Sequence, residues 1–327
     1  MKRYIVRTIK RKRQNSYTYD YTDRNGKPVS QETIRKVTNS LYIPPAQDNV
    51  QINLNKHEKV LAIGYDEKGR AQYTYNKQYT EKRNHEKFKH MITLGESYSK
   101  ILRKIKQDMY SEAETKEKQI ATILRFVIDC SFRIGNEKYT RENKSYGVTT
   151  LESRHVRTNG TEIKVSFVGK KGVHNHCVFR NKKLSKNLRT KKKTLKPKDR
   201  LFSYRKGARY YNVRPSDVNR YLRKFGNFTT KNFRTWTANI ELLHQLVKNS
   251  ELFTDVSESR KTKIVNHCVD KVADKLHNTR AVCKQNYIDP RIIEIAINDT
   301  AQLQGFRNCT TKEDYTEEYL RFLKKRD

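Results

Sequence analysis

The first 80 residues alternate between polar and apolar or aromatic positions in short runs. The segment 17–21 places a tyrosine at every second position, and the turn-forming pair Asn25-Gly26 follows it. A second apolar run lies at 60–65, and a polar turn separates it from a third run at 72–75. A period of two with glycine-containing turns is typical of antiparallel strands joined by hairpins. The pattern therefore predicts a small β domain over residues 1–80.

The strand expected at 72–75 carries a candidate nucleic-acid surface. In an extended strand Tyr73 and Tyr75 share one face, and Gln72 and Thr74 lie on the other. Aromatic and amide side chains among lysines and arginines suit contact with DNA. The same tyrosines would equally suit the packing of a half-exposed sheet. The pattern alone leaves both interpretations open.

Beyond residue 80 the period changes to that of a helix. Apolar residues recur at helical spacing at Ile120, Ile123, Leu124, Val127 and Ile128. Further stripes of this kind lie over 233–247 and 264–276. We therefore expect an α+β protein with a small antiparallel β domain at 1–80 and a larger, mainly α-helical domain at 81–327.

A single predicted hairpin interrupts this helical region. Residues 163–167 alternate as a strand, and Gly169-Lys170-Lys171-Gly172 forms the turn into a second strand. Lys170 is thus expected at a hairpin tip, although a lone lysine in a turn is most often simply solvated. We interpret the lysine-rich stretch 181–200 that follows as an exposed connection.

The composition adds a strong positive field. The chain of 327 residues has 71 Lys+Arg against 35 Asp+Glu, a formal net charge of +36. Such a charge favours a polyanionic partner, and double-stranded DNA is the leading candidate. A basic protein that is merely soluble, or ribosome-like, is the alternative that charge alone leaves open.

Several other classes of protein find no support. There is no run of about 18 apolar residues that would span a membrane, and the first residues lack the apolar core of a signal peptide. The five cysteines include no Cys-x-x-Cys pair, which favours reduced thiols in a cytoplasmic protein, or in a virion if the source is viral. Zinc-site spacing and a Walker-type loop are both absent. We accordingly expect no metal, no cofactor and no membrane partner.

The segment 276–290 places a tyrosine among cations and amides. Tyr287 follows Arg280, Lys284 and Asn286 instead of lying in an apolar stripe. A phenol in such surroundings can attack phosphorus and form a covalent intermediate, although most tyrosines serve as packing surfaces or hydrogen-bond donors. The rest of the chain must therefore supply the partners of such a reaction.

Breaking a phosphodiester in this way needs cations on the non-bridging oxygens and an acid for the departing 5′ oxygen. Arg133 and Arg234 can supply the guanidinium groups, whose fork matches phosphate geometry, and Lys170 can supply the acid. A further hydrogen bond could come from Asn278 or His277. Spacing alone does not assemble this set.

Four segments in a fixed order do assemble it. They are 133–139 (RIGNEKY), 167–170 (FVGK), 231–236 (KNFRTW) and 278–288 (NTRAVCKQNYI). Together they resemble the small type IB DNA topoisomerases of poxviruses and bacteria, over most of residues 70–295. Each segment is weak by itself, and the ordered combination is highly specific.

The resemblance implies a role for each of the charged residues. Tyr287 is then the nucleophile that forms a 3′-phosphotyrosyl bond with DNA. Arg133 and Arg234 stabilise the transition state, and Lys170 is the general acid.

The resemblance leaves one catalytic position open. The family's fifth position lies nine residues before the tyrosine, and this is Asn278, with His277 as its neighbour. Either side chain could donate the hydrogen bond. Relatives often have proline where this chain has Arg280, which would alter the local turn.

The resemblance also implies an activity and a DNA surface. We expect nicking of duplex DNA, relaxation of positive and negative supercoils and religation, without ATP or metal, by a monomer that clamps around DNA. Gln72, Tyr73 and Tyr75 resemble a poxviral strand that reads the major groove, and Lys138 and Tyr139 resemble a second DNA-contacting pair. A preference for a CCCTT-like site follows as a hypothesis.

Two alternatives compete with this interpretation. A tyrosine recombinase shares the nucleophile and the arginines, but recombinases commonly carry histidine three residues before the second arginine, where this chain has Lys231. A noncatalytic DNA-packaging protein would use only its charge, and it would leave the ordered set of residues unexplained.

Overall fold

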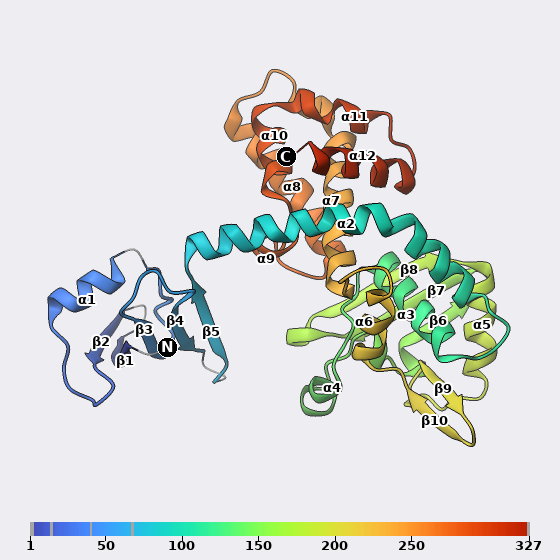
Figure 1. Ribbon diagram of the computed structural model, residues 1–327, viewed down its shortest axis with the longest axis horizontal. Coiled ribbons are helices and arrows are strands. Elements are labelled where there is room, and N and C mark those ends of the chain that lie inside the picture. Colours follow the sequence, from blue (N-terminus) through green and yellow to red (C-terminus); the bar gives the residue numbers. More distant parts are fainter. Residues whose placement is uncertain (1–2, 14–15, 40, 67–68, 326–327) are drawn as a thin grey trace. The chain divides into compact units, whose positions relative to one another are not determined.

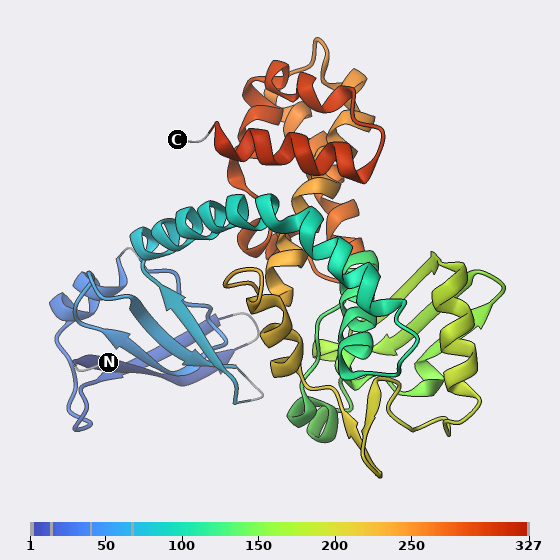
Figure 2. The ribbon, with the colours of Figure 1, turned by 45° about the vertical axis from the view of Figure 1, so that its right-hand side comes forward.

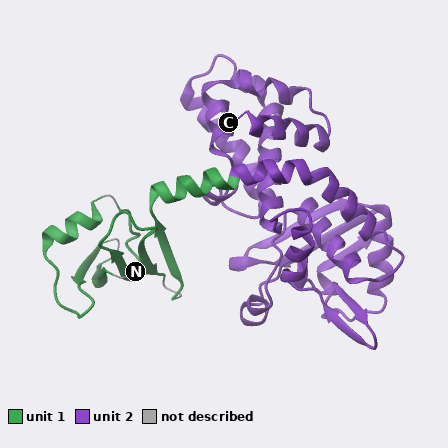
Figure 3. Ribbon diagram, in the orientation of Figure 1, with its two compact units in different colours: residues 1–87 green, residues 88–327 purple. Residues whose placement is uncertain are grey.

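The computed structural model describes residues 3–13, 16–39, 41–66 and 69–325. They form two compact units, residues 1–87 and 88–327 (Figure 3). Each unit has its own cluster of buried apolar residues. The architecture is α+β, as the sequence predicts, because an antiparallel sheet precedes a mainly helical region.

Unit 1 is built on a five-stranded antiparallel sheet of order β2-β1-β3-β4-β5. The strands are β1 (Tyr4–Arg13), β2 (Ser16–Thr22), β3 (Asp48–Asn53), β4 (Val60–Tyr65) and β5 (Ala71–Tyr75). The expectation of strands alone misses helix α1 (Gln31–Thr38), where the Ser30 hydroxyl accepts a hydrogen bond from the Thr33 N–H at 3.3 Å. Such a side-chain cap favours the helix start.

The register of the sheet separates a buried face from an open face. Ile5 pairs with Ile52, which pairs in turn with Ala62, and all three are buried. Tyr73 pairs with Ile63, the neighbour of Ala62 along β4, and therefore lies on the opposite face. The prediction that Tyr73 and Tyr75 share one face of a strand is confirmed, and that face is turned away from the core.

Unit 2 contains most of the helices. They are α2 (Lys77–Met109, which begins in unit 1), α3 (Lys116–Cys130), α4 (Glu137–Asn143), α5 (Lys182–Lys192), α6 (Pro215–Arg223), α7 (Thr230–Lys248), α8 (Glu258–Leu276), α9 (Arg280–Asn286), α10 (Pro290–Asn298), α11 (Gln304–Arg307) and α12 (Lys312–Lys324). Short 3-10 turns lie at η1 (Val148–Thr150), η2 (Ser153–His155), η3 (Lys170–Gly172), η4 (Ser250–Phe253) and η5 (Thr300–Leu303). The helix predicted around residues 120–128 is α3.

Two small sheets complete unit 2. An antiparallel sheet of order β6-β7-β8 consists of β6 (Val156–Asn159), β7 (Glu162–Val168) and β8 (His174–Arg180), and a hairpin consists of β9 (Ser203–Lys206) and β10 (Arg209–Asn212). The three-stranded sheet and α5 lie at one end of the unit, and α10, α11 and α12 lie at the other (Figures 1 and 2).

Trp236 on α7 is a packing centre of unit 2. Its ring centroid lies 5.4 Å from that of Tyr98 on α2 and 4.9 Å from that of Tyr319 on α12. A Cβ atom added at Gly95 would lie 2.6 Å from the indole, so only glycine lets α2 approach this closely. The buried aromatic cluster therefore fixes α7, which carries Arg234, against two other helices.

The interpretation of 181–200 as an exposed connection is wrong for its first half, which forms α5. The Asn181 side chain caps the helix by accepting a hydrogen bond from the Leu184 N–H at 2.9 Å, and Leu184 and Leu188 are buried one turn apart. The Lys191 ammonium donates to the Gln119 side chain at 2.5 Å, and burial lowers the pKa of Lys191 to about 8. The two leucines lie among many lysines, so the apolar pattern of the helix is weak in the sequence.

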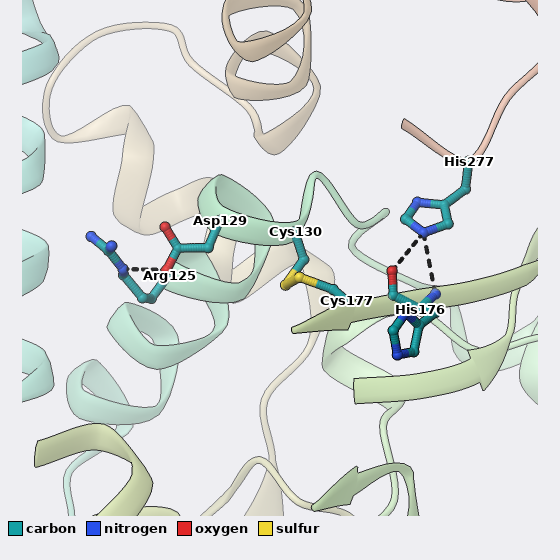
Figure 4. Close-up of a disulfide and its surroundings, with 6 residues drawn as sticks. All are labelled: Arg125, Asp129, Cys130, His176, Cys177 and His277. Carbon is teal, nitrogen blue, oxygen red and sulfur yellow. Dashed lines mark hydrogen bonds and ion pairs between the residues drawn. A yellow bond between two sulfur atoms is a disulfide. The ribbon is translucent and has the colours of Figure 1, made fainter. Parts of the chain in front are cut away.

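The expectation of reduced thiols is also wrong for one pair of cysteines. Cys130, at the end of α3, forms a disulfide with Cys177 on β8, with the two Cα atoms 5.6 Å apart (Figure 4). The pair is separated by 47 residues of sequence, so a search for closely spaced cysteines does not reveal it. The other three cysteines, at positions 268, 283 and 309, are free.

Within the described ranges, no helix combines the length and apolar character needed to cross a membrane. The same residues contain no group of three or more His, Cys, Asp or Glu side chains arranged to hold a metal ion.

Candidate active site

Tyr287 closes the short helix α9. The Thr279 hydroxyl begins this helix by accepting from the Val282 N–H at 3.4 Å, and the Tyr287 N–H donates to the Cys283 carbonyl at 3.0 Å. The side chain of Tyr287 is only 8% exposed. A helix of two turns is not stable by itself, so packing against neighbours must position the tyrosine.

A buried amide on α7 supplies much of that support. The Asn239 Nδ2 group donates to the Tyr287 carbonyl at 3.0 Å, and its Oδ1 accepts from the Asp289 N–H at 2.7 Å. Asn239 is fully buried, so its bonds are shielded from water. Sequence reasoning missed Asn239, although an amide inside the apolar stripe of α7 was a usable signal.

Arg234 lies on α7 and is 3% exposed. Its Nη2 donates to the Leu276 carbonyl at 3.1 Å, and its Cζ lies 5.3 Å from the centroid of the Tyr287 ring. Its Nε and Nη1 are buried and have no hydrogen-bond acceptor among the described residues. Buried donors without partners are costly, so an arginine in this state is prepared to receive an anion.

The cations around Tyr287 change the chemistry of its phenol. Burial by itself would raise the pKa of Tyr287, but the positive charge of Arg234, followed by Arg133 and Lys231, lowers that pKa below its ordinary value of 10.0. Burial in turn lowers the pKa of the Arg234 guanidinium below its ordinary value. An arginine stays protonated at neutral pH even so. The arrangement therefore favours the nucleophilic phenolate form.

Arg133 and Asn278 meet across 145 residues of sequence. The Arg133 Nη2 donates to the Asn278 Oδ1 at 2.5 Å. The Asn278 backbone N–H donates to the Ala273 carbonyl at 2.9 Å, which fixes the residue just beyond the end of α8. The Asn278 Nδ2 is buried without an acceptor among the described residues. Asn278 thus orients Arg133 and keeps a donor of its own.

The backbone that presents Arg133 is held by the segment at η1. The Val148 N–H donates to the Arg133 carbonyl at 2.9 Å, and the Thr149 N–H donates to the Ile134 carbonyl at 2.8 Å. A Cβ atom at Gly147 would lie 2.4 Å from the backbone of Gly135. The two segments approach this closely because Gly147 has no Cβ atom, and Gly135 has a φ of 100°, which glycine adopts without strain.

His277 makes contacts of a different kind. Its backbone is left-handed, with a φ of 53°, and it caps the end of α8. Its Nε2 lies 3.1 Å from the carbonyl oxygen and 3.2 Å from the N–H of His176 on β8 (Figure 4). Its ring lies 5.3 Å from that of Phe132. The imidazole therefore bonds to a strand, whereas the amide of its neighbour Asn278 meets Arg133.

Lys170 lies in η3, in the turn between β7 and β8. The prediction of a lysine at a hairpin tip is confirmed, and the side chain is exposed. None of the described residues forms a hydrogen bond or an ion pair with its ammonium group. The structure thus brings these residues together in two pairs, Arg133 with Asn278 and Arg234 with Tyr287. Lys170 belongs to neither pair.

The candidate DNA-contacting residues of unit 1 form an open aromatic surface. Tyr73 and Tyr75 are 53% and 37% exposed, and their rings stack 6.1 Å apart. The Arg83 guanidinium lies 5.7 Å from the centroid of the Tyr75 ring. Gln72 lies on the other face, where its amide donates to the Asp66 carboxylate at 3.0 Å. Stacked rings beside a cation are suited to nucleic-acid contact.

Lys138 and Tyr139 lie in the first turn of α4. The Asn136 side chain caps this helix by accepting from the Lys138 N–H at 2.8 Å. Both side chains are exposed, and Tyr139 is 54% exposed. Asn136 follows the Arg133 segment within the same loop, so the pair lies close in sequence to the site.

The comparisons with known proteins agree over nearly the whole chain. The family model for the catalytic core of eukaryotic DNA topoisomerase I matches residues 76–308, and the model for the N-terminal domain of bacterial DNA topoisomerase IB matches residues 18–66. The DNA topoisomerase 1B of Acanthamoeba polyphaga mimivirus is 29% identical over 317 residues, which cover 95% of this chain and 92% of the viral protein. The DNA topoisomerase 1B of Vaccinia virus (strain Copenhagen) is 24% identical over 282 residues, or 84% and 86% of the two chains.

Neither the recombinase nor the packaging alternative agrees with these matches. The catalytic-core model alone covers more than half of the chain, and it includes all the candidate catalytic residues, from Arg133 to Tyr287. The chain therefore belongs to the type IB DNA topoisomerases, and it is an isomerase that acts on DNA.

Proposed function

We propose that this topoisomerase relaxes positive and negative supercoils by nicking one strand of duplex DNA, letting the free end swivel and resealing the nick. The observation that carries the proposal is the pairing of Arg234 with Tyr287. A buried guanidinium with two unpartnered nitrogens stands over a phenol whose pKa is lowered. A phosphate is the group that would satisfy both residues at once.

In the proposed reaction the Tyr287 oxygen attacks phosphorus and loses its proton to solvent. The bond from phosphorus to the 5′ oxygen breaks, and a 3′-phosphotyrosyl bond forms. Lys170 gives a proton to the departing 5′ oxygen, which is a poor leaving group as an alkoxide. Religation reverses these steps, and the retained bond energy makes ATP unnecessary.

Arg133 and Arg234 bind the non-bridging phosphate oxygens, where charge increases in the transition state. Asn278 is the better candidate for the fifth position, because its Oδ1 orients Arg133 and its Nδ2 remains a free donor. His277 is engaged with His176 instead. With Lys170, the two arginines supply three positive charges, so the proposed reaction uses neither a metal ion nor a cofactor.

We further propose that the two units act as a clamp around duplex DNA, as a monomer. The net charge of +36 supports many phosphate contacts and strongly salt-dependent binding. Tyr73, Tyr75, Lys138 and Tyr139 are exposed for such contacts. Gln72 would have to leave Asp66 to reach a base edge, and a CCCTT-like preference would then come from this strand. In a cell we expect the enzyme in the cytoplasm, or in a virion if its source is viral.

The test is relaxation of supercoiled plasmid in EDTA without ATP. The wild type should relax plasmid of either sign, and Tyr287→Phe should show none, because the nucleophile is lost. Tyr210→Phe, which removes a hydroxyl from the exposed β9–β10 hairpin, is the matched control and should behave as wild type. Denaturing gels with end-labelled DNA should show a covalent adduct on the 3′ phosphate.

Three results would count against parts of the proposal. Relaxation by Tyr287→Phe would exclude Tyr287 as the nucleophile. An adduct on the 5′ end would reverse the polarity, and activity that depends on added metal would exclude the metal-free reaction. Breaks at unrelated sequences along a mapped plasmid would remove the CCCTT hypothesis alone.

A further inference from the structure

A closed circuit of contacts runs through the disulfide and back to Arg133. Arg133 donates to Asn278, and the next residue, His277, bonds to the backbone of His176. The residue after His176 is Cys177, which is joined to Cys130, three positions before Arg133 (Figure 4). Arg133 is thus held in two ways. Its side chain bonds to Asn278, and its backbone follows closely after Cys130, which the disulfide fixes to β8.

The turn between Cys130 and Arg133 is tightly packed. Ser131 has a left-handed backbone, with a φ of 52°, and it ends α3. The Phe132 ring is fully buried, and it lies 4.8 Å from the ring of Phe167 and 5.3 Å from that of His277. Phe132 therefore anchors this turn against β7 on one side and against His277, at the end of α8, on the other.

We propose that the Cys130–Cys177 disulfide and the His277 imidazole are positioning residues for Arg133 and Asn278, so that the rate of DNA cleavage depends on the redox state of this cysteine pair. The inference rests on the proposed function, because it assigns Arg133 and Asn278 to phosphate binding. The disulfide itself is proposed to contact neither the DNA nor the tyrosine. It acts through the short turn from Cys130 to Arg133, because the covalent bond ties the start of this turn to β8, the strand that binds His277.

The redox step needs a reductant of the dithiol class. A dithiol gives two electrons and two protons to the disulfide, the Cys130–Cys177 bond breaks to two thiols, and the dithiol closes to a cyclic disulfide. Cys177 is partly exposed and Cys130 is buried, so attack on the Cys177 sulfur is the accessible route. Oxidation by a disulfide reagent of the same class reverses the step.

Reduction should loosen the site without dismantling it. The Val148 N–H bond to the Arg133 carbonyl remains, and so does the packing of Phe132. A displacement of about 1 Å at a reacting centre can change a rate by about 10²-fold. Because part of the support survives, we expect the rate of covalent adduct formation at saturating DNA to fall by about tenfold on reduction. DNA affinity should be unchanged.

The experiment compares the oxidised and the dithiol-reduced full-length enzyme. It measures the single-turnover rate of covalent adduct formation on a DNA duplex from which the short fragment beyond the cleavage site dissociates, so that religation does not occur. Mass spectrometry of the intact protein reports the state of the cysteine pair in each sample. The double variant Cys130→Ser/Cys177→Ser should have the rate of the reduced enzyme in both conditions. Cys309→Ser removes a free cysteine from another part of unit 2, and it should keep the full redox response.

The second arm tests His277. His277→Ala should lower the rate about as much as reduction does, and His277→Gln should restore most of it, because its amide can reach the His176 backbone in place of Nε2. A positioning role also predicts non-additivity. In an Arg133→Lys background the redox effect should shrink, since the group being positioned has changed. A general loss of stability would lower every rate by the same factor and would leave the redox ratio intact.

The outcomes separate this inference from the proposed function. Adduct formation at equal rates in the two verified redox states overturns the inference and leaves the proposed function standing. Cysteines 130 and 177 that stay reduced under oxidising conditions overturn it as well. No adduct in either state rejects the proposed function, and with it the role assigned to Arg133. A tenfold redox ratio that disappears in the double variant establishes the inference.

Discussion

The candidate site contains two regions of opposite construction. Arg234 and Tyr287 are 3% and 8% exposed. Arg234 lies on α7, which Trp236 packs against α2 and α12, and Asn239 of the same helix bonds to the Tyr287 carbonyl. Lys170 stands on an exposed turn, with no partner among the described residues. The proposed phosphate-binding region is therefore formed before DNA arrives, whereas the proposed proton donor is free until then.

This difference follows from what each region must do. Donors that stabilise transition-state charge work best when they are fixed in a dry environment in advance. A general acid must be able to reach the leaving group once DNA is bound, and a lysine on an exposed turn has the mobility to do so. The comparison predicts that substitutions in the two regions will differ in three measurements. These are the change in protein stability, the rescue of activity by a modified DNA substrate and the shift of the Tyr287 titration midpoint.

The largest expected effect comes from the buried region. Arg234→Met should lower the single-turnover rate of adduct formation by about 10⁴-fold, because arginines that stabilise a transferring phosphoryl group have effects of about 10³- to 10⁵-fold. The melting temperature should stay the same or rise, since the desolvation of a buried ion is relieved. Arg307→Met, which removes an exposed arginine on α11, is the control for net charge. A near-normal rate in Arg234→Met would contradict the buried region's role.

A smaller effect is expected from the exposed region. Lys170→Ala should lower the rate by about 10²- to 10³-fold, in the lower part of the usual range for a general acid. Unfolding free energy should change by less than about 0.5 kcal/mol, as for other surface substitutions. Lys171→Asn, in the same turn, is the matched control, because asparagine tolerates the left-handed φ of 65° at that position.

A modified substrate sharpens the same comparison. Sulfur in place of the bridging 5′ oxygen departs as a thiolate, which needs no proton. It should restore most of the activity of Lys170→Ala and little of that of Arg234→Met. Equal rescue of the two variants, or rescue of neither, would contradict the assignment of proton donation to Lys170 and of transition-state stabilisation to Arg234.

The smallest effect concerns the titration of Tyr287. Its pKa is lowered, so the phenolate should form at a pH below the ordinary value of about 10. Ultraviolet absorbance of wild type minus that of Tyr287→Phe isolates this one tyrosine among the 20 in the chain. Arg133→Gln should move the midpoint upward because a nearby positive charge is lost, and Lys170→Ala should leave it in place. A midpoint at or above 10 in the wild type would contradict the electrostatic account.

Much of the local structure follows from the sequence. The strand β5, the hairpin that carries Lys170 and the helix α3 are all predicted by their apolar periods, because each period depends only on neighbours in the chain. The candidate residues themselves were brought together by the order of four segments and the family they resemble. Periodicity alone would not have selected Tyr287 from the other tyrosines.

The remaining features depend on contacts between distant parts of the chain. Nothing near Arg133 indicates that its partner is Asn278, and nothing near Cys130 indicates Cys177. Asn239 looks like a break in an apolar stripe until its two backbone partners are seen. Helix α5 was missed because its two buried leucines stand among lysines, whose long side chains extend to solvent from the same helix.

The contact between Gly135 and Gly147 limits how this enzyme can vary. A side chain at Gly147 would collide with the backbone of Gly135 and would lie 2.7 Å from the Arg133 carbonyl oxygen. The two positions are thus structurally coupled, although helix α4 separates them in the sequence. In a library that randomises the segment around Arg133, variants at either glycine will be lost with the fold before any selection for chemistry acts. Variants that fold are expected instead at exposed positions of the flanking helices.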